Sequence, residues 1–274
     1  MKRITKSIIA VSFALALAGC GSSGTSTSSS EDKTISIGVT PVPHAEIVND
    51  VVKGLLEDEG WTLDVVEFND YVQPNTSVEE GELDANYYQT INYLDEQNES
   101  RGFHLKAVAG IHLEPMGLYS KSLTSLDALE DGATIAIPND GSNESRALKL
   151  LADNNLITLK DTDGLYTLES VDTNTKNFKF QELEAANLTR SLDDVDAAVI
   201  NGNYALEADL SPAKDAIISE STDGEDAYKY INYLVVKEGN EETEKTKALE
   251  AALTSDEVKD YIDKTYEGSV IAAF

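Results

Sequence analysis

Hydrophobic residues change their spacing twice between residues 34 and 68. Polar and apolar residues alternate over 35–39, as they do in a strand that is buried on one face. Apolar residues then recur at helical spacing over 47–56, and Gly60 follows as a stop signal. A second strand is predicted over 63–68. This order of strand, helix and strand is typical of an α/β fold with parallel strands.

The same kinds of element return later in the chain. The turn at 138–141 lies between a short apolar strand and a helix that has an apolar side. The residues from about 241 to 266 predict two helices. The further strands are predicted over 134–137, 195–200 and 233–236.

An acidic turn followed by an apolar residue, Asp and Ala occurs twice. Leu83-Asp84-Ala85 is followed by Asn86, and Val195-Asp196-Ala197 is followed by Asn201. We interpret this echo as two similar α/β lobes, each of which presents polar loop residues to a shared ligand cleft. Coincidence in an Asp-rich chain is the alternative.

The first twenty residues have the features of an export signal. Three basic residues precede an apolar run over 8–17, which is too short to span a bilayer. The run ends in the segment 17–20, Leu-Ala-Gly-Cys, which resembles the bacterial lipobox. We therefore predict a signal peptide over residues 1–19 and lipidation of Cys20, with the protein anchored on the extracytoplasmic face of the cell membrane. The alternative is an ordinary signal peptide with a chance cysteine.

A Ser-, Thr- and Gly-rich segment follows the predicted lipid anchor. Residues 20–33 have no apolar periodicity and predict a flexible tether with a reach of roughly 20 Å. The helices and strands predicted after it belong to the globular part of the chain.

Charge and cysteine content exclude several classes of protein. Among 274 residues, 50 are acidic and 21 basic, which gives a formal net charge of −29. A field of this sign repels nucleic acid, so we predict no nucleic-acid partner. One cysteine allows neither an internal disulfide nor a cysteine-rich zinc site.

The motifs of common catalytic sites are missing from the sequence. There is no nucleophile elbow, phosphate-binding loop, dinucleotide fingerprint or zinc-protease motif. Their absence leaves acid–base catalysis by the many carboxylates unsupported but not excluded. We predict a protein that is not an enzyme and has no catalytic residues, cofactor or metal. Most of its carboxylates are interpreted as a solvated surface.

A cleft that binds a small zwitterion needs a cation, amide groups and an apolar wall. Arg146 is the candidate cation, because it lies near the start of a helix that follows 141–143 and because arginine grips both oxygens of a carboxylate. A surface arginine is the alternative. Tyr71 and one member of the pair Tyr87-Tyr88 are candidate walls, with core packing as the alternative.

Two asparagines at strand boundaries are candidates for holding the polar end of an amino acid. Asn201 follows one predicted strand, and Asn232 precedes another. Their amide groups offer both a donor and an acceptor. Turn or cap formation is the alternative.

Seven ordered segments of the chain together resemble one family. They are 39–47, 66–75, 81–89, 114–120, 137–148, 192–205 and 230–232. The most specific of them read VEFNDYVQPN and LDDVDAAVINGNYA. With these segments, the sequence resembles the NlpA family of substrate-binding lipoproteins, the methionine-binding components of ABC importers.

The resemblance implies a type II periplasmic-binding-protein fold. Such a fold has two α/β lobes joined by two crossings, which we place near 119–120 and 232. Lobe 1 is then expected over 34–119 plus 233–274, and lobe 2 over 120–232.

The resemblance also implies a set of ligand-binding residues. By position, Arg146 matches the carboxylate-binding arginine of the family. The full set implied is Tyr71, Tyr88, Thr90, Asn143, Arg146, Asn201 and Asn232. The sequence departs from the family at Thr90, where a pocket histidine is usual, and at Asn92, where proline is usual. This departure leaves the ligand open between methionine, another amino acid, D-methionine and a methionine-containing dipeptide.

The function implied is capture of an amino acid, foremost methionine, between lobes that close on it. The protein then delivers the ligand to an ABC permease and its ATPase, and it is expected to be a monomer. A lipid-anchored enzyme or an adhesin on the same scaffold are the competing hypotheses.

Overall fold

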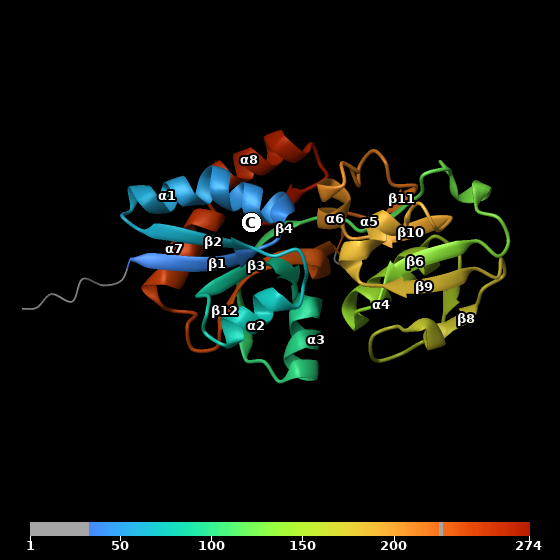
Figure 1. The fold of residues 1–274 in the computed structure, drawn as a ribbon, viewed down its shortest axis with the longest axis horizontal. Helices are drawn as coiled ribbons and strands as arrows, with labels where there is room; N and C mark the ends of the chain where they lie inside the picture. Colours follow the sequence, from blue (N-terminus) through green and yellow to red (C-terminus); the bar gives the residue numbers. More distant parts are fainter. Residues whose placement is uncertain (1–32, 225–226) are drawn as a thin grey trace, which may run out of the picture. The chain divides into compact units, whose positions relative to one another are not determined.

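The computed structural model describes residues 33–224 and 227–274, which fold into two α/β lobes (Figure 1). The predicted signal peptide, Cys20 and nearly all of the predicted tether lie outside the described residues. No helix among the described residues is long and apolar enough to cross a bilayer.

The first lobe is built on a six-stranded mixed sheet. Its strand order is β13-β4-β12-β3-β1-β2. The strands are β1 (Thr34–Val39), β2 (Thr62–Glu67), β3 (Ala85–Thr90), β4 (Leu105–Leu113), β12 (Ile231–Lys237) and β13 (Ile271–Ala272). Strand β1 pairs in parallel with β2 and β3, whereas β12 runs antiparallel to β3 and β4.

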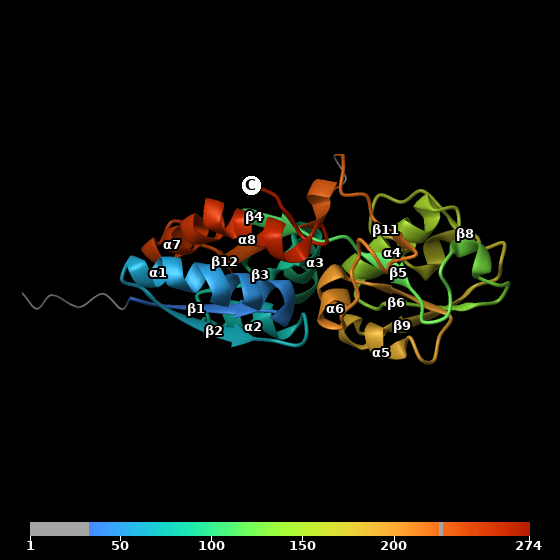
Figure 2. The same ribbon diagram turned by 90° about the horizontal axis from the view of Figure 1, so that it is seen from above.

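Helices cover both faces of this sheet. The helices are α1 (Lys53–Asp58), α2 (Gln73–Glu79), α3 (Ile91–Arg101), α7 (Glu244–Leu253) and α8 (Asp256–Tyr266), and two short π-helical segments, Pro41–Ala45 and Val48–Val52, precede α1. Figure 2 shows α1, α7 and α8 side by side, where their apolar residues share one core with Ile35 and Ile37 of β1. On the other face, Val78 of α2 and Leu94 of α3 form a smaller core. The two helices predicted over 241–266 are therefore present as α7 and α8.

The second lobe is built on a five-stranded sheet with the order β11-β5-β10-β6-β9. Its strands are β5 (Gly117–Tyr119), β6 (Thr134–Pro138), β9 (Lys179–Leu183), β10 (Ala197–Ile200) and β11 (Ile218–Ser219), and β7 (Thr158–Leu159) and β8 (Val171–Thr173) form a separate pair. Its helices are α4 (Gly141–Asp153), α5 (Leu188–Ser191) and α6 (Gly202–Glu207), with single turns at Leu126–Ala128, Leu168–Ser170 and Ala185–Asn187. Ile135 and Ile137 pack in one core and Ala136 in the other, as the period of two in a strand requires.

The chain crosses between the lobes twice, as the type II fold requires, but the boundaries differ slightly from those predicted. Strand β5 pairs with β10 of the second sheet, so the first crossing lies between Leu113 and Gly117 and not near 119–120. The second crossing precedes Ile231, which already pairs with Leu113. Strand β5 has only three residues, too few for their periodicity to show which sheet they join.

The echo around Asp84 and Asp196 has a shared structural role. Asp84 accepts a hydrogen bond from the backbone N–H of Ser36 at 2.8 Å, and Asp196 accepts one from that of Thr134 at 2.7 Å. Each carboxylate therefore ties the entry of one strand to the start of the neighbouring strand. The expectation that Asn86 faces the cleft is wrong, because its amide is buried in β3 and bonds to Asn75 at 2.9 Å.

Candidate ligand-binding site

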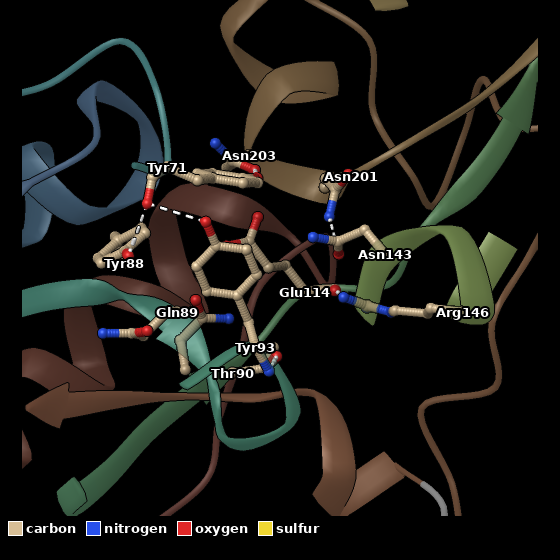
Figure 3. Close-up of a pocket in the computed structure, with 12 residues that line it drawn as sticks. Tyr71, Tyr88, Gln89, Thr90, Tyr93, Glu114, Asn143, Arg146, Asn201 and Asn203 are labelled. Carbon is tan, nitrogen blue, oxygen red and sulfur yellow. Dashed lines mark hydrogen bonds between the residues drawn. The ribbon is translucent and has the colours of Figure 1, made fainter. Parts of the chain in front are cut away.

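A partly open cavity lies between the lobes, where the carboxyl ends of several strands meet (Figure 3). Its free volume is about 20 Å³, room for about one water molecule, so a ligand of amino-acid size needs the cavity to widen. The lining residues are Tyr71, Tyr88, Gln89, Thr90, Tyr93, Glu114, Asn143, Arg146, Asn201, Gly202, Asn203 and Asn232.

All seven residues of the predicted set line this one cavity. Sequence reasoning missed five lining residues: Gln89, Tyr93, Glu114, Gly202 and Asn203. All except Tyr93 lie inside the segments that carry the family resemblance, so motif membership was the available signal. What the motifs did not show is which of their polar side chains point inward.

Arg146 comes from the second turn of α4. Its side chain is buried and pairs with a carboxylate of the same lobe. Its Nε and Nη2 atoms each donate to Glu220 at 2.6 Å, and Nη2 also donates to the carbonyl oxygen of Glu114 at 3.0 Å. Its guanidinium carbon lies 4.2 Å from the ring centre of Tyr230. Burial alone lowers the pKa of Arg146, but the adjacent Glu220 outweighs it and leaves that pKa above its usual value.

This pairing corrects one part of the expectation for Arg146. The two-oxygen grip is made with Glu220, so that edge of the guanidinium is already in use. Arg146 still lines the cavity, so its guanidinium remains a candidate contact for an occupant.

A chain of side-chain hydrogen bonds leads from the start of α4 to the cavity. Asp140 caps the helix by accepting from the backbone and side-chain nitrogens of Asn143 at 2.9 and 2.8 Å. Asn143 in turn accepts from Asn201 Nδ2 at 2.8 Å. The amide of Asn201 is therefore fixed, with Oδ1 as its remaining acceptor.

Three buried polar atoms of the cavity have no hydrogen-bond partner among the described residues. They are Glu114 Oε2, Asn201 Oδ1 and Asn203 Nδ2. A buried polar atom without a partner costs about 1–3 kcal/mol, so such atoms are rare unless something outside the chain satisfies them. Two acceptors and one donor in one cavity match a ligand that carries both a positive and a negative group.

Tyrosine rings form the other side of the cavity. The ring of Tyr71 lies 5.8 Å from that of Tyr88, 5.7 Å from that of Tyr93 and 4.9 Å from that of Tyr204, between ring centres. The hydroxyls of Tyr88 and Tyr93 donate to the carbonyl oxygen of Tyr71 at 2.8 and 3.0 Å. Because these hydroxyls are already hydrogen-bonded within the protein, the tyrosines present mainly the surface of their rings to a ligand.

Tyr71 also connects the two lobes. It comes from the loop after β2, and its hydroxyl donates to Asn203 Oδ1 at the start of α6 (Figure 3). This contact leaves Asn203 Nδ2 as the unpartnered donor. Burial raises the pKa of Tyr71 well above its usual value, so the hydroxyl stays protonated and able to donate.

Thr90 has a local structural role at the position of the family's usual histidine. It is the N-cap of α3, and its hydroxyl accepts from the backbone N–H of Tyr93 at 3.4 Å. Threonine suits a cap position, so Thr90 both starts the helix and lines the cavity.

Glu114 lies at the inner wall of the cavity, against two buried histidines. Its Oε1 atom is 3.2 Å from His112 Nε2 and 3.6 Å from His44 Nε2. Burial raises the pKa of Glu114 to about 7, although His44 and Arg146 pull that pKa downward. Burial lowers the pKa of both histidines to about 3. Near neutral pH the histidines are uncharged, and Glu114 is the group that changes charge.

Two α/β lobes that enclose a polar cavity define the class of two-lobed solute-binding proteins. Within that class, the sequence matches the NlpA lipoprotein family over residues 35–274, and the chain belongs to this family.

Curated relatives cover most of the chain. The D-methionine-binding lipoprotein MetQ of Escherichia coli K12 is 40% identical over 240 residues, which are 86% of this chain and 87% of that protein. The membrane lipoprotein TpN32 of Treponema pallidum is 38% identical over 242 residues, 88% of each chain. These relatives are named as lipoproteins and binding proteins and not as enzymes, and the chain is a member of the same non-enzymatic family.

Solved structures share both the fold and the sequence. A lipoprotein from Ruminococcus gnavus is 49% identical with a TM-score of 0.86, over 88% of this chain and 100% of that one. A nutrient-binding protein from Burkholderia cenocepacia, solved with methionine bound, is 43% identical with a TM-score of 0.83 over the same shares.

Proposed function

We propose that this protein is an extracytoplasmic solute-binding lipoprotein that captures methionine between its lobes and delivers it to an ABC permease with its ATPase. The observation that carries the proposal is the interlobe cavity in which buried acceptors and a buried donor lack partners beside a wall of tyrosines. The methionine-bound relative and the relatives named for D-methionine support the same ligand class.

The polar end of an amino acid has a partner for each of its charges. Its ammonium group is held by Glu114 Oε2 and Asn201 Oδ1, the two acceptors without a partner. Its carboxylate is held by Asn203 Nδ2, by the amide of Asn232 and by the guanidinium of Arg146. Hydrogen bonds in which one group is charged are the stronger kind, so this end supplies most of the specificity.

The side chain of the ligand faces the tyrosine wall. A thioether is polarisable and packs favourably against aromatic rings about 5 Å away, which fits methionine. Thr90 sets the remaining wall, and the loss of the family's usual histidine there keeps another amino acid, D-methionine and a methionine-containing dipeptide as alternative ligands.

The cellular location that we propose for the protein rests on its family and on its N-terminal sequence. Lipidation at Cys20 holds the protein on the extracytoplasmic face of the membrane, and residues 20–33 tether the lobes to it. The large excess of acidic residues maintains solubility there, since a zwitterion needs no electrostatic steering. ATP is consumed by the transporter partner, and the binding protein acts as a monomer.

The ligand itself is identified by mass spectrometry of the protein as purified. Native spectra are expected to show an added mass that denaturation releases as methionine. After the ligand is stripped, adding methionine at about 100 times its dissociation constant is expected to stabilise the fold by about 2.7 kcal/mol and to raise the melting temperature. Recovery of an unrelated small molecule, with no thermal shift from any amino acid or short peptide, would contradict the proposal.

The pKa of Glu114 makes binding dependent on pH. The ammonium group binds the ionised carboxylate, and the pKa of Glu114 in the ligand-free protein is raised to about 7. Methionine affinity is therefore expected to weaken as the pH falls through 7 and to level off above it, while the ligand stays protonated on nitrogen. The histidines beside Glu114 do not contribute, because their pKa of about 3 lies below this window.

Calorimetric titration between pH 5 and pH 7.5 measures this dependence. The matched control is Glu114→Gln, which keeps the shape of the side chain but cannot ionise. We expect this variant to bind more weakly and with a nearly flat pH profile. An unchanged slope in Glu114→Gln would show that another group controls the titration.

A further inference from the structure

The buried histidines of the first lobe lie behind the cavity and have no role in the proposed function. His44 and His112 are fully buried, and their ring centres are 4.9 Å apart. Neither residue lines the cavity, yet each contacts one that does. His112 Nε2 lies 3.2 Å from Glu114 Oε1, and His44 Nε2 lies 3.1 Å from Asn232 Oδ1.

Contacts on the far side of each ring determine where its single proton lies. Thr40 Oγ1 is 2.8 Å from His44 Nδ1, and the hydroxyl of Tyr87 contacts His112 Nδ1. Asn232 Oδ1 and an ionised Glu114 only accept hydrogen bonds, so both Nε2 atoms must donate. Each Nδ1 then accepts from the hydroxyl next to it, and every ring nitrogen has a partner.

This hydrogen bonding fixes the direction of two cavity side chains. Because Asn232 directs its oxygen to His44, the amide nitrogen is the group it has left to donate to a carboxylate. Because Glu114 directs Oε1 to His112, Oε2 is the oxygen without a partner that meets the ammonium group. The histidines thus determine which polar atom each of these side chains shows to the ligand.

We propose that His44 and His112 are positioning residues that make the cleft specific for ligands with a free α-ammonium group and a free α-carboxylate. This inference rests on the proposed function and deepens it. His112 acts through Glu114 on recognition of the ammonium group, and His44 acts through Asn232 on recognition of the carboxylate. The cleft therefore rejects amino acids that are blocked at either end.

The same side chains also have the composition of a divalent-metal site. One donor atom each from His44, His112 and Glu114 lie within 4.8 Å of one another. Two imidazoles and a carboxylate are ligands that zinc accepts. The observations favour positioning, because Asn232 and Glu114 already use both Nε2 atoms.

The first test compares ligands that lack one charged group. Wild-type protein is expected to bind methionine far better than 4-(methylthio)butanoic acid, which has no ammonium group, or methionine amide, which has no carboxylate. In His112→Leu, the ratio of affinities for methionine and for 4-(methylthio)butanoic acid is expected to fall about tenfold, while the ratio for methionine and methionine amide stays unchanged. In His44→Leu, the ratio for methionine and methionine amide is expected to fall about tenfold, while the other ratio stays unchanged. A variant that is merely less stable would weaken all three ligands together.

Further variants separate positioning from folding. His112→Gln and His44→Gln retain a donor near Nε2, so they are expected to recover most of the discrimination. His104→Gln changes a histidine whose side chain is 66% exposed and serves as the matched control. In a Glu114→Gln background, His112→Leu should have little further effect, because the group it positions is already neutral. Equal losses for all ligands, or the full effect of His112→Leu in that background, would overturn the proposal.

A second test needs no ligand. Long-range proton–nitrogen NMR spectra of the ligand-free protein are expected to show both buried rings protonated at Nε2 at about pH 8.5, where Glu114, with a pKa of about 7, is ionised. Protonation at Nδ1, or retention of one equivalent of zinc after dialysis against zinc chloride, would overturn the proposal. Failure of the wild type to bind methionine with Nε2 protonation intact would instead contradict the proposed function and leave the positioning geometry standing.

Discussion

Replacing Arg146 with alanine is expected to weaken methionine binding by about tenfold to a hundredfold and to destabilise the second lobe. The substitution leaves Glu220 without its cation, although the Glu220 side chain is only 7% exposed. Removing one partner of a buried ion pair typically costs about 3–5 kcal/mol. It also removes the guanidinium from the cavity wall, and the loss of a charge-assisted hydrogen bond accounts for the expected fall in affinity.

A double variant separates these two consequences. In Arg146→Ala with Glu220→Gln, the second substitution removes the buried charge, so we expect most of the lost stability to return and the affinity for methionine to stay low. Arg190→Ala, at an exposed arginine of the same lobe, is the matched control and should bind normally. Denaturant unfolding and calorimetry measure the two quantities. Normal affinity in the double variant would show that Arg146 is only a structural residue.

Gly202→Ala is the second substitution with a large expected effect, because the methyl group has no space. A Cβ atom at this position would lie 2.8 Å from both Cβ and Oε2 of Glu114 and 3.1 Å from the carbonyl oxygen of Pro115. Overpacking of this kind costs about 1–3 kcal/mol. It also displaces the oxygen assigned to the ammonium group, so methionine affinity should fall together with stability.

The chain offers a matched control for this glycine substitution. A Cβ atom at Gly54 of α1 would have no neighbour within 4 Å. Gly54→Ala is therefore expected to leave binding unchanged and to stabilise the helix by up to about 1 kcal/mol. Melting temperatures and calorimetry of the two variants provide the comparison. Wild-type affinity in Gly202→Ala would show that Glu114 Oε2 has no part in binding.

Local patterns predicted much of the fold because the strands and helices follow their own periods. The strand alternation over 35–39 and the helical spacing over 47–56 both reflect one buried core. The boundary after residue 119 was wrong because the sheet that β5 joins is decided by pairing with distant β10. The pattern of three residues cannot show which distant strand they pair with.

The site was predicted by residue type and motif, whereas its hydrogen bonding was not. Arg146 and Glu220 are 74 positions apart, and Glu220 lies in a loop without periodicity. Nothing local shows that their charges meet, so the two-oxygen grip was assigned to the ligand. The same reason explains why Glu114 was missed, since its orphaned oxygen becomes visible only when Asn201 and Gly202 are placed beside it.

Direct calorimetric titration of the ligand-stripped wild-type protein with methionine tests the central claim most directly. We expect one molecule to bind per chain, with a dissociation constant in the micromolar range or below and much weaker binding of both methionine amide and the analogue without an ammonium group. The account would be contradicted if methionine, every other amino acid and short peptides all gave no binding heat and no competition up to millimolar concentration.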